Sequence, residues 1–275
     1  MTPNMPMLTF NDGRTMPQMG FGLWQVPSGD TAEIVGEAVR AGYRMFDGAA
    51  IYGNEEGLGE GLRRSGLSRD EYFVTTKVWN DRQGSDSAIR AAEESMDRLG
   101  LDRLDLLLIH WPAPQRDLYV DTWKALIRLR DEGRVTSIGV SNFLPDHLDR
   151  LVGETGVVPV LNQIELHPEL PQAELRQKHA ELGIVTQSWT PLGQSRTFDH
   201  PVIRRVAERT GATPAQVILA WHVALGCAVI PRSTKAERLR ENLEALAIQL
   251  EPQEVAAIEG LENGHRTGPN PLTFS

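Results

Sequence analysis

Eight short apolar runs alternate with longer amphipathic stretches along this chain, and that alternation restricts its possible folds more than any other feature. A continuous apolar run is typical of a strand buried on both faces, as in a parallel sheet covered by helices. Eight such units predict a (β/α)8 TIM barrel, and an open doubly wound sheet is the alternative. The eight runs are MGFGLW, YRMFDG, YFVTTKVW, LDLLLIHW, VTSIGVSNF, PVLNQIEL, IVTQSW and CAVIPRS.

The stretches between the runs have the periodicity of helices. In residues 31–42, Ile34, Val35, Ala38 and Val39 fall on one face. A hairpin is expected before the first run, because Asn-Asp-Gly favours a tight turn between MLTF and RTMP. No linker-like segment divides the chain, so residues 1–275 are expected to form one domain with extra C-terminal helices. Further helices are predicted near Asn54, at 86–99, near Leu118, Pro145, Gln172, Pro201 and Thr213, and at 235–246 and 251–261.

Composition narrows the function classes. A formal net charge of -9 and a pI near 5.3 argue against a surface for nucleic acid or an anionic membrane, but leave room for a local basic pocket. The single cysteine, Cys227, cannot form an internal disulfide and lies in an apolar run, which indicates a buried small side chain. The N-terminus lacks the features of a signal peptide, and no apolar run approaches the ~20 residues of a membrane span. We expect a cytoplasmic protein.

Glycine-rich segments do not give the dinucleotide fingerprint G-x-G-x-x-G. In GFGLWQ, Gln25 stands at the third glycine position. In GLGEGL, Gly57, Gly59 and Gly61 are followed by Leu62 at the required place. Close backbone packing or a turn is the better interpretation of both. A dinucleotide, if bound, is bound without this motif.

Unusual residues follow the predicted strands. In a parallel barrel, working residues come from the carboxyl ends of the strands and the loops after them. Each residue alone has an ordinary explanation, such as a helix cap, a packed ring or a solvated ammonium, but their coincidence at one rim favours a functional site. No metal site is expected, because His167 has acidic neighbours but fits the loop after the sixth run, and the other histidines lack a partner at metal-ligand spacing; these are His147, His179, His200, His222 and His265. The rim residues are Trp24, Asp47, Tyr52, Lys77, Trp79, His110, Trp111, Ser141, Asn142, Gln163 and Trp189.

Six segments carry a resemblance that covers nearly the whole chain. In order, they are FDGAAIYGNEEGLGEGL, TTKVWN, LDLLLIHWP, IGVSNF, NQIELHP and IPRSTKAERLREN, and they resemble the aldo-keto reductase family. The bacterial branch with the 2,5-diketo-D-gluconate reductases is most similar, given the short loops and SWTPLGQ. Two positions depart from the family pattern: Gly48 stands where threonine is frequent, and Arg232 where lysine is usual.

The resemblance implies a catalytic tetrad of Asp47, Tyr52, Lys77 and His110. Reduction of a carbonyl needs a hydride at carbon, which nicotinamide supplies, and a proton at oxygen. A tyrosine, with an ordinary pKa near 10, stays protonated at neutral pH and can donate to a developing alkoxide. We expect Lys77 to lower the pKa of Tyr52, Asp47 to keep Lys77 charged, and His110 to stay neutral because Lys77 is close.

The resemblance also implies bound NADP(H) and an apolar substrate wall. Ser141, Asn142 and Gln163 are expected at the nicotinamide carboxamide, Trp189 on the ring, and residues 190–194 around the pyrophosphate. IPRSTKAERLREN is expected at the adenosine 2′-phosphate, with Glu241 and Asn242 at the adenine. The implied substrate contacts are Trp24, Tyr52, Trp79, His110 and Trp111. The implied cofactor contacts are Gly22, Leu23, Trp24, Asp47, Ser141, Asn142, Gln163, Trp189, Thr190, Pro191, Leu192, Gly193, Gln194, Arg232, Ser233, Thr234, Lys235, Arg238, Glu241 and Asn242.

We therefore expect an NADPH-dependent reductase of aldehydes and ketones, acting on small dicarbonyls, aromatic aldehydes or keto-sugar acids. The family's common state is a monomer. A nucleotide-sensing barrel is one rival, but a sensor has no need of Tyr52 or His110. A barrel isomerase or metal-dependent aldolase is another, and it leaves the segment after the last run unexplained. The C-terminal NGHRTGPNPLTFS is a candidate for a loop that completes the substrate pocket.

Overall fold

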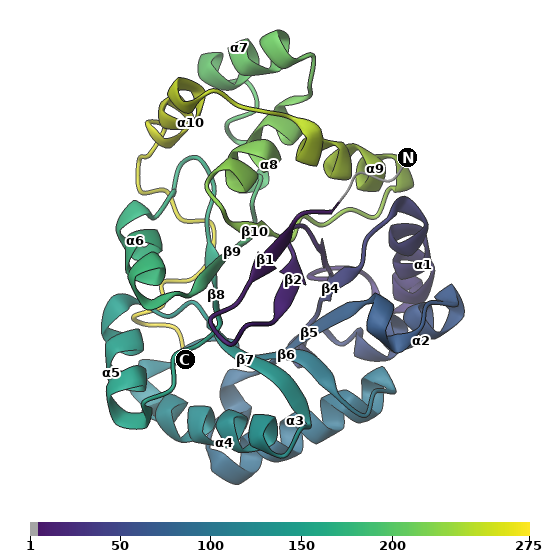
Figure 1. Ribbon diagram of the computed structural model, residues 1–275, viewed down its shortest axis with the longest axis vertical. Coiled ribbons are helices and arrows are strands. Elements are labelled where there is room, and N and C mark those ends of the chain that lie inside the picture. The colour runs from purple at the N-terminus through teal and green to yellow at the C-terminus, as the bar shows by residue number, and fades with distance from the viewer. Residues whose placement is uncertain (1–4) are drawn as a thin grey trace.

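Eight parallel strands occupy the eight apolar runs in the computed structural model, which describes residues 5–275 (Figure 1). Their order in the sheet is their order in the chain. The two edges meet where Met19 bridges Val229 in parallel, with the Gly20 N–H donating to the Val229 carbonyl at 2.8 Å. The barrel is closed, so the (β/α)8 prediction is confirmed and the open doubly wound sheet is wrong. The strands are β3 (Phe21–Gly22), β4 (Met45–Asp47), β5 (Phe73–Val78), β6 (Leu104–Ile109), β7 (Val135–Ser141), β8 (Leu161–Glu165), β9 (Val185–Trp189) and β10 (Ala228–Val229).

Helices surround the barrel, as Figure 1 shows. Of the face predicted for residues 31–42, α1 buries Ile34, Val35 and Ala38 in the large apolar core, while Val39 is partly buried beside it. The helix after β9 is doubled, and α10 is an extra helix near the C-terminus, as expected. The helices are α1 (Thr31–Ala41), α2 (Glu55–Ser65), α3 (Ser85–Leu99), α4 (Tyr119–Asp131), α5 (Pro145–Thr155), α6 (Ala173–Leu182), α7 (Pro201–Thr210), α8 (Pro214–Ala224), α9 (Ala236–Glu244) and α10 (Pro252–Glu259).

The predicted hairpin is confirmed and decides which end of the barrel is open. Strands β1 (Met7–Thr9) and β2 (Thr15–Pro17) pair antiparallel, and the hairpin lies across the barrel end that faces the viewer in Figure 1. Phe10 and Met16 are buried in one apolar cluster with Leu106 and Leu108, on the inward face of β6. Because this hairpin plugs the end where the strands begin, the carboxyl ends of the strands carry the accessible rim.

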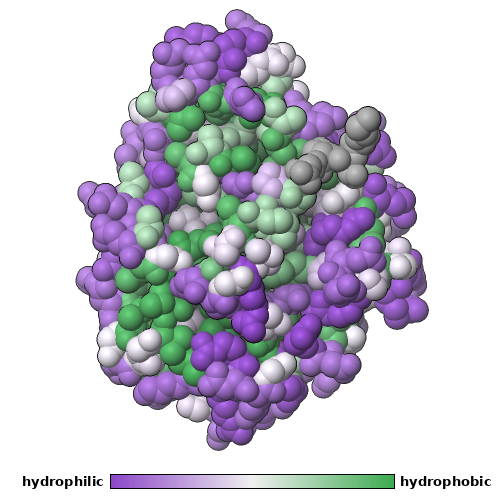
Figure 2. Space-filling view, viewed as in Figure 1, coloured by the Kyte–Doolittle hydropathy of each residue, from purple (hydrophilic) through white to green (hydrophobic). Residues whose placement is uncertain are grey.

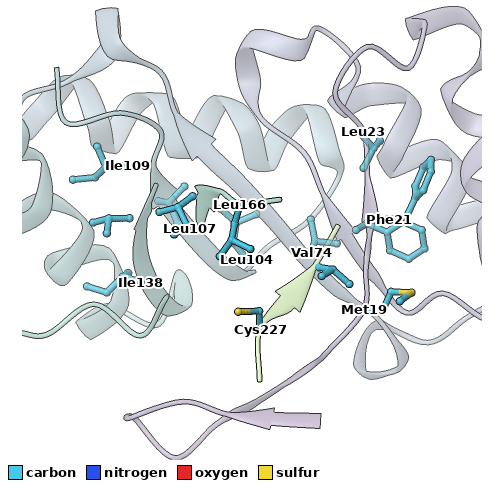
Figure 3. Packing of buried hydrophobic residues seen from close by; sticks show 14 of the residues in the cluster. Met19, Phe21, Leu23, Val74, Leu104, Leu107, Ile109, Ile138, Leu166 and Cys227 are labelled. Atoms are coloured by element: carbon cyan, nitrogen blue, oxygen red, sulfur yellow. The ribbon is translucent and has the colours of Figure 1, made fainter. Parts of the chain in front are cut away.

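The outward faces of the strands form the larger core against the helices. Leu107, Ile109 and Ile138 belong to it, and Figure 3 shows them with Cys227 and with Phe21 of β3. Cys227 is 1 % exposed, and burial raises the pKa of its thiol to about 12, which confirms the prediction of a buried small side chain. Hydrophilic side chains gather over the outer helices on the face drawn in Figure 2. Within residues 5–275, no helix combines the length and the apolar character needed to cross a membrane.

The glycines of α2 serve close helix packing. A Cβ at Gly59 would lie 2.2 Å from the Leu99 carbonyl oxygen of α3, and one at Gly61 would lie 2.7 Å from the Val35 Cβ of α1. Larger residues would push α2 away from both neighbours. The interpretation of GLGEGL as a packing segment is confirmed.

Candidate active site

A buried ion pair lies at the carboxyl ends of β4 and β5. Lys77 Nζ is 2.5 Å from Asp47 Oδ1 and donates a second hydrogen bond of 2.8 Å to the Gly48 carbonyl. The two side chains are 0 % and 2 % exposed. Burial alone would lower the pKa of Lys77, but the adjacent Asp47 carboxylate raises it, so the ammonium form is favoured. The pair forms because Asp47 ends β4 and Lys77 is the next-to-last residue of β5, and the carboxyl ends of these neighbouring strands meet at the same rim.

Tyr52 reaches this pair from the loop after β4. Its hydroxyl lies 3.4 Å from Lys77 Nζ, which also sits 5.1 Å from the centre of the ring. A short 3₁₀ turn, Ala50–Tyr52, carries the residue. Asn54 then fixes the loop, because its amide donates to the carbonyls of Leu23 and Val26 at 3.0 and 3.1 Å. The phenol is thereby held above the ammonium.

The pKa of Tyr52 does not follow the expectation. Burial raises it above its ordinary value of 10.0, and the positive charge of Lys77 opposes this effect only in part. The prediction of a lowered pKa was wrong in its net direction, although the contribution of Lys77 has the expected sign. Desolvation of the phenolate outweighs its attraction to one ammonium that Asp47 already pairs.

His110 stands at the end of β6, next to the phenol. Its ring lies 5.7 Å from the Tyr52 ring and 4.9 Å from the Trp79 ring, measured between centres. Burial lowers the pKa of His110 well below 6.5, and Lys77 lowers it further. The expected neutral imidazole is confirmed, with burial rather than Lys77 as the larger cause. Among the described residues Nδ1 has no hydrogen-bond partner.

The residues expected at the nicotinamide carboxamide form a connected network beside the ion pair. Gln163 donates to Asp47 Oδ2 at 2.7 Å, a contact that sequence reasoning did not predict. Asn142 donates to the His110 carbonyl at 3.0 Å and accepts from Trp189 Nε1 at 2.8 Å. Ser141 donates to the carbonyl of Gln163 at 2.9 Å. The structure thus brings the three residues predicted at the carboxamide together with Trp189, predicted on the ring, at one place on the rim.

The segment expected at the pyrophosphate, residues 190–194, follows β9 and has an unusual backbone. Thr190, Gly193 and Gln194 have φ values of +49°, +52° and +54°. Successive N–H groups in such conformations form concave sites for anions. His222, from α8, supports the segment: its Nε2 donates to the Pro191 carbonyl at 2.9 Å, since a carbonyl can only accept. Leu192 lies in the same turn, where its carbonyl accepts from Ser195 N–H.

The segment after β10 presents cations without acidic partners. Within residues 5–275, no carboxylate forms an ion pair with Arg232, Lys235 or Arg238, and all three are exposed. Arg232 instead donates to the Gln25 carbonyl at 3.1 Å. Ser233 is 8 % exposed, and Thr234 is exposed beside it. Three free cations in an acidic chain suit one anionic group such as a phosphate.

The residues expected at the adenine are already engaged within the protein. Glu241 Oε1 accepts a hydrogen bond of 2.7 Å from Thr213, at the start of α8. Asn242 is 5 % exposed.

Gly22 and Leu23, predicted cofactor contacts, form backbone hydrogen bonds with two other parts of the site. The Gly22 N–H donates to the Pro231 carbonyl at 3.3 Å, and the Leu23 N–H donates to the Asp47 carbonyl at 2.9 Å. Gly22 and Leu23 therefore join the cation segment to the ion pair through the backbone.

Aromatic rings cluster around Tyr52 and His110. Trp24, 53 % exposed, lies 4.9 Å from the Tyr52 ring. Trp111 is 6 % exposed and packs 4.7 Å from Phe274, which also lies 6.1 Å from Trp79. Phe274 was not singled out, although its segment was named as a candidate pocket loop, because nothing local in the sequence places the tail. Among residues 5–275 no group of three or more possible ligands is arranged to hold a metal ion.

The Aldo/keto reductase family model matches residues 18–263. An aldo-keto reductase from Mycobacterium sp. (strain KMS) is 51% identical over 270 residues, which cover 98% of each chain. A methylglyoxal reductase DkgA from Yersinia pestis is 46% identical over 271 residues, covering 98% of this chain and 97% of its own.

Solved structures with the same fold include cofactor complexes. A variant of Gox0644 in complex with NADPH is 48% identical, with a TM-score of 0.95 over 98% of this chain and 99% of that chain. A Bombyx mori aldo-keto reductase in complex with NADP is 34% identical, with a TM-score of 0.89 over 95% and 94% of the two chains.

Proposed function

Because the chain belongs to the aldo/keto reductase family, we propose that it reduces aldehydes and ketones to alcohols with NADPH as the hydride donor. As a member of that family it is an oxidoreductase that acts on carbonyl groups. The observation that carries the proposal is the position of one ammonium, Lys77 Nζ, between the Asp47 carboxylate and the Tyr52 hydroxyl. This arrangement suits proton transfer to a carbonyl oxygen.

Tyr52 is the proposed proton donor. The alkoxide produced from a carbonyl is about as basic as hydroxide, so a phenol donates to it downhill even with a raised pKa. The proton leaves the phenol oxygen and the phenolate remains beside Lys77, whose charge stabilises it. Asp47 keeps that charge in place, since an ammonium buried without a counter-ion would lose its proton.

His110 is the proposed orienting group. A neutral imidazole can donate one hydrogen bond to a substrate oxygen without adding a second positive charge beside Lys77. Its low pKa, caused mainly by burial, keeps it neutral throughout the physiological range. Trp79 packs edge-on against the ring and limits its rotation.

The chain's residues fit NADP(H). Bound nicotinamide supplies the hydride, which no side chain can supply. We propose that Ser141, Asn142 and Gln163 hold the carboxamide and that Trp189 stacks on the ring. The left-handed backbone of 190–194 fits a pyrophosphate, and the unpaired Arg232, Lys235 and Arg238, with Ser233 and Thr234, fit a 2′-phosphate.

The substrate wall favours compact carbonyl compounds with an apolar or planar side. Trp24, Trp79 and Trp111, with Phe274, form the aromatic wall beside Tyr52 and His110. We propose small dicarbonyls and aromatic aldehydes as the main substrates, with keto-sugar acids as further candidates; relatives in Yersinia pestis and Salmonella typhimurium are named methylglyoxal reductases. We further propose that residues 1–275 act as one domain, monomeric and cytoplasmic.

Oxidation of NADPH by the purified protein tests this function. The panel is methylglyoxal, an aromatic aldehyde, an aldose and a keto-sugar acid, each with wild type and with Tyr52→Phe as the matched control. We expect turnover with methylglyoxal and the aromatic aldehyde, and its loss in the variant. A protein that binds NADPH yet reduces no member of the panel contradicts the proposal and favours a sensing role.

A further inference from the structure

Glu165, the last residue of β8, is a buried carboxylate that the proposed chemistry does not use. Its side chain is 0 % exposed. Burying a carboxylate is costly unless hydrogen bonds and a counter-charge compensate it. The hydrogen-bond partners of this carboxylate therefore indicate its structural role.

Those partners come mainly from the C-terminal tail. Thr267 donates to Glu165 Oε1 through both its N–H, at 2.5 Å, and its hydroxyl, at 2.6 Å. The Gly268 N–H donates to both oxygens at 3.3 and 3.4 Å, and Arg266 Nη1 donates to Oε2 at 3.3 Å. Three consecutive tail residues thus converge on one carboxylate, about 100 positions away in the sequence. The pKa of Glu165 is lowered despite burial, because these donors and His167 favour the charged form.

His167 fixes the orientation of the carboxylate. Its Nε2 lies 3.2 Å from Glu165 Oε1, and a carboxylate can only accept, so Nε2 donates. The imidazole is itself fully buried beneath Gly193, where a Cβ would lie 3.2 Å from the ring. Through His167, Glu165 is therefore connected to the segment proposed for the pyrophosphate, and it binds the tail directly.

The tail leads from this anchor to the substrate wall. Gly268 passes directly over Trp189, since a Cβ there would lie 2.4 Å from the indole. The chain then reaches Phe274, which packs on Trp111 and Trp79. Gln115 also holds this end: its Nε2 donates to the Leu272 carbonyl at 3.0 Å, and its Oε1 accepts from the Ser275 hydroxyl.

We propose that Glu165 is a positioning residue that ties the C-terminal tail over the active site and so sets Phe274 against the substrate. The substrate half of this inference rests on the proposed function. Glutamine at 165 cannot replace the carboxylate, because both oxygens accept from N–H groups. Whichever way the amide is turned, its own NH₂ faces a donor. The tail should therefore detach more often in Glu165→Gln.

Limited proteolysis measures detachment without any activity. Trypsin cleaves after arginine, and the Arg266–Thr267 bond is protected while the Thr267 N–H is bound to Glu165. Losing one charge-assisted hydrogen bond changes an opening equilibrium by about 10- to 150-fold. We expect Glu165→Gln to release residues 267–275 about 10-fold or more faster than wild type, followed by mass spectrometry of the intact chain.

Two variants make the comparison specific. Glu55→Gln removes a buried carboxylate that binds Thr76 and Arg98, neither of which belongs to the tail, and should leave release of 267–275 unchanged. Thr267→Val removes only the hydroxyl donor and keeps the carboxylate and Arg266. It should accelerate release by a few-fold, about 5-fold for one hydrogen bond, and it serves if Glu165→Gln does not fold.

Kinetics separate positioning from simple destabilisation. Glu165→Gln should raise KM for an aromatic aldehyde about 10-fold with kcat nearly unchanged, as expected when ground-state and transition-state binding fall together. Phe274→Ala should reproduce this change, and Glu55→Gln should not. Equal release of 267–275 in wild type, Glu165→Gln and Thr267→Val overturns the proposal. A protein inactive on all carbonyl compounds would overturn the proposed function and leave the proteolysis result standing.

Discussion

The amide of Gln163 donates a hydrogen bond of 2.7 Å to Asp47 Oδ2, across the barrel from β8 to β4. The other carboxylate oxygen is bound by Lys77 at 2.5 Å. Both oxygens are therefore satisfied, although the carboxylate is 2 % exposed. A residue proposed to bind the nicotinamide carboxamide thus also stabilises the ion pair beneath the phenol. This link makes removal of either charge costly.

Lys77→Met should damage both activity and stability. It leaves Asp47 with one neutral donor, and breaking a buried ion pair costs roughly 3–5 kcal/mol. Urea unfolding should show a loss of that size, and turnover should fall because the Tyr52 phenolate loses its stabilising charge. The control is Lys124→Met, since Lys124 is 53% exposed and pairs with Asp121 on a helix surface. A stable, active Lys77→Met protein contradicts the coupling of Asp47 to Lys77.

Tyr52→Phe should remove the proton donor and little else. General acids typically contribute about 10²- to 10⁴-fold, so turnover should fall within that range. The ring still packs beside Trp24 and His110, so NADPH affinity, measured by fluorescence titration, should stay near wild type. Tyr72→Phe, which alters a phenol next to Arg69 and outside the site, should keep full turnover. Retained turnover in Tyr52→Phe would assign the proton transfer to another group.

The fold was predictable because its signals are local and repeated. Runs such as LDLLLI are apolar on both faces of the strand, and β6 separates an inner cluster at Leu106 and Leu108 from an outer one at Leu107 and Ile109. One such run alone does not define a fold, but eight runs separated by helices predict a closed barrel. The closing contact between Met19 and Val229 is a tertiary feature that no local pattern encodes.

The stability of the protein should fall in mild acid because two histidines are buried without charge. Burial lowers the pKa of His179 and of His222 to about 3, from an ordinary 6.5. Below about pH 6.5 the unfolded chain binds protons that the native protein does not, so stability is full above that pH and is lost as the pH falls toward 3. Each histidine contributes up to ~1.4 kcal/mol per pH unit, which integrates to about 3 kcal/mol for both between pH 6.5 and 5.

Urea unfolding at about pH 7.5 and pH 5 checks this dependence. The double variant His179→Gln, His222→Gln should be less stable at the higher pH but lose less free energy between the two. His265→Gln, at a partly exposed position, should keep the dependence of wild type. Equal losses in wild type and the double variant would assign the acid sensitivity to other groups.

The residues of the site were predictable from the sequence. The net pKa shift of Tyr52 and the path of the C-terminal tail were not. Strand ends place Asp47, Lys77 and His110 at one rim, and that follows from topology alone. The raised pKa of Tyr52 is the sum of opposing effects, whose sizes depend on burial that the sequence does not reveal. Phe274 and Glu165 meet the site through a tail whose path is fixed by tertiary hydrogen bonds, and no periodic pattern encodes such a path.

Arg238→Ala should weaken NADPH binding selectively. Arg238 lies in the first turn of α9, exposed and without an acidic partner among residues 5–275, so its guanidinium is free to grip a phosphate. Hydrogen bonds to charged groups are worth about 1.5–3 kcal/mol, which predicts a Kd for NADPH raised roughly 10- to 150-fold. NADH lacks the 2′-phosphate, so its Kd should change little. Arg240→Ala, an exposed arginine two residues further along the same helix, is the matched control and should spare both cofactors. Parallel titrations of NADPH and NADH test this prediction. Equal losses of affinity for both cofactors would mean that Arg238 supports the fold of the segment and does not bind the 2′-phosphate.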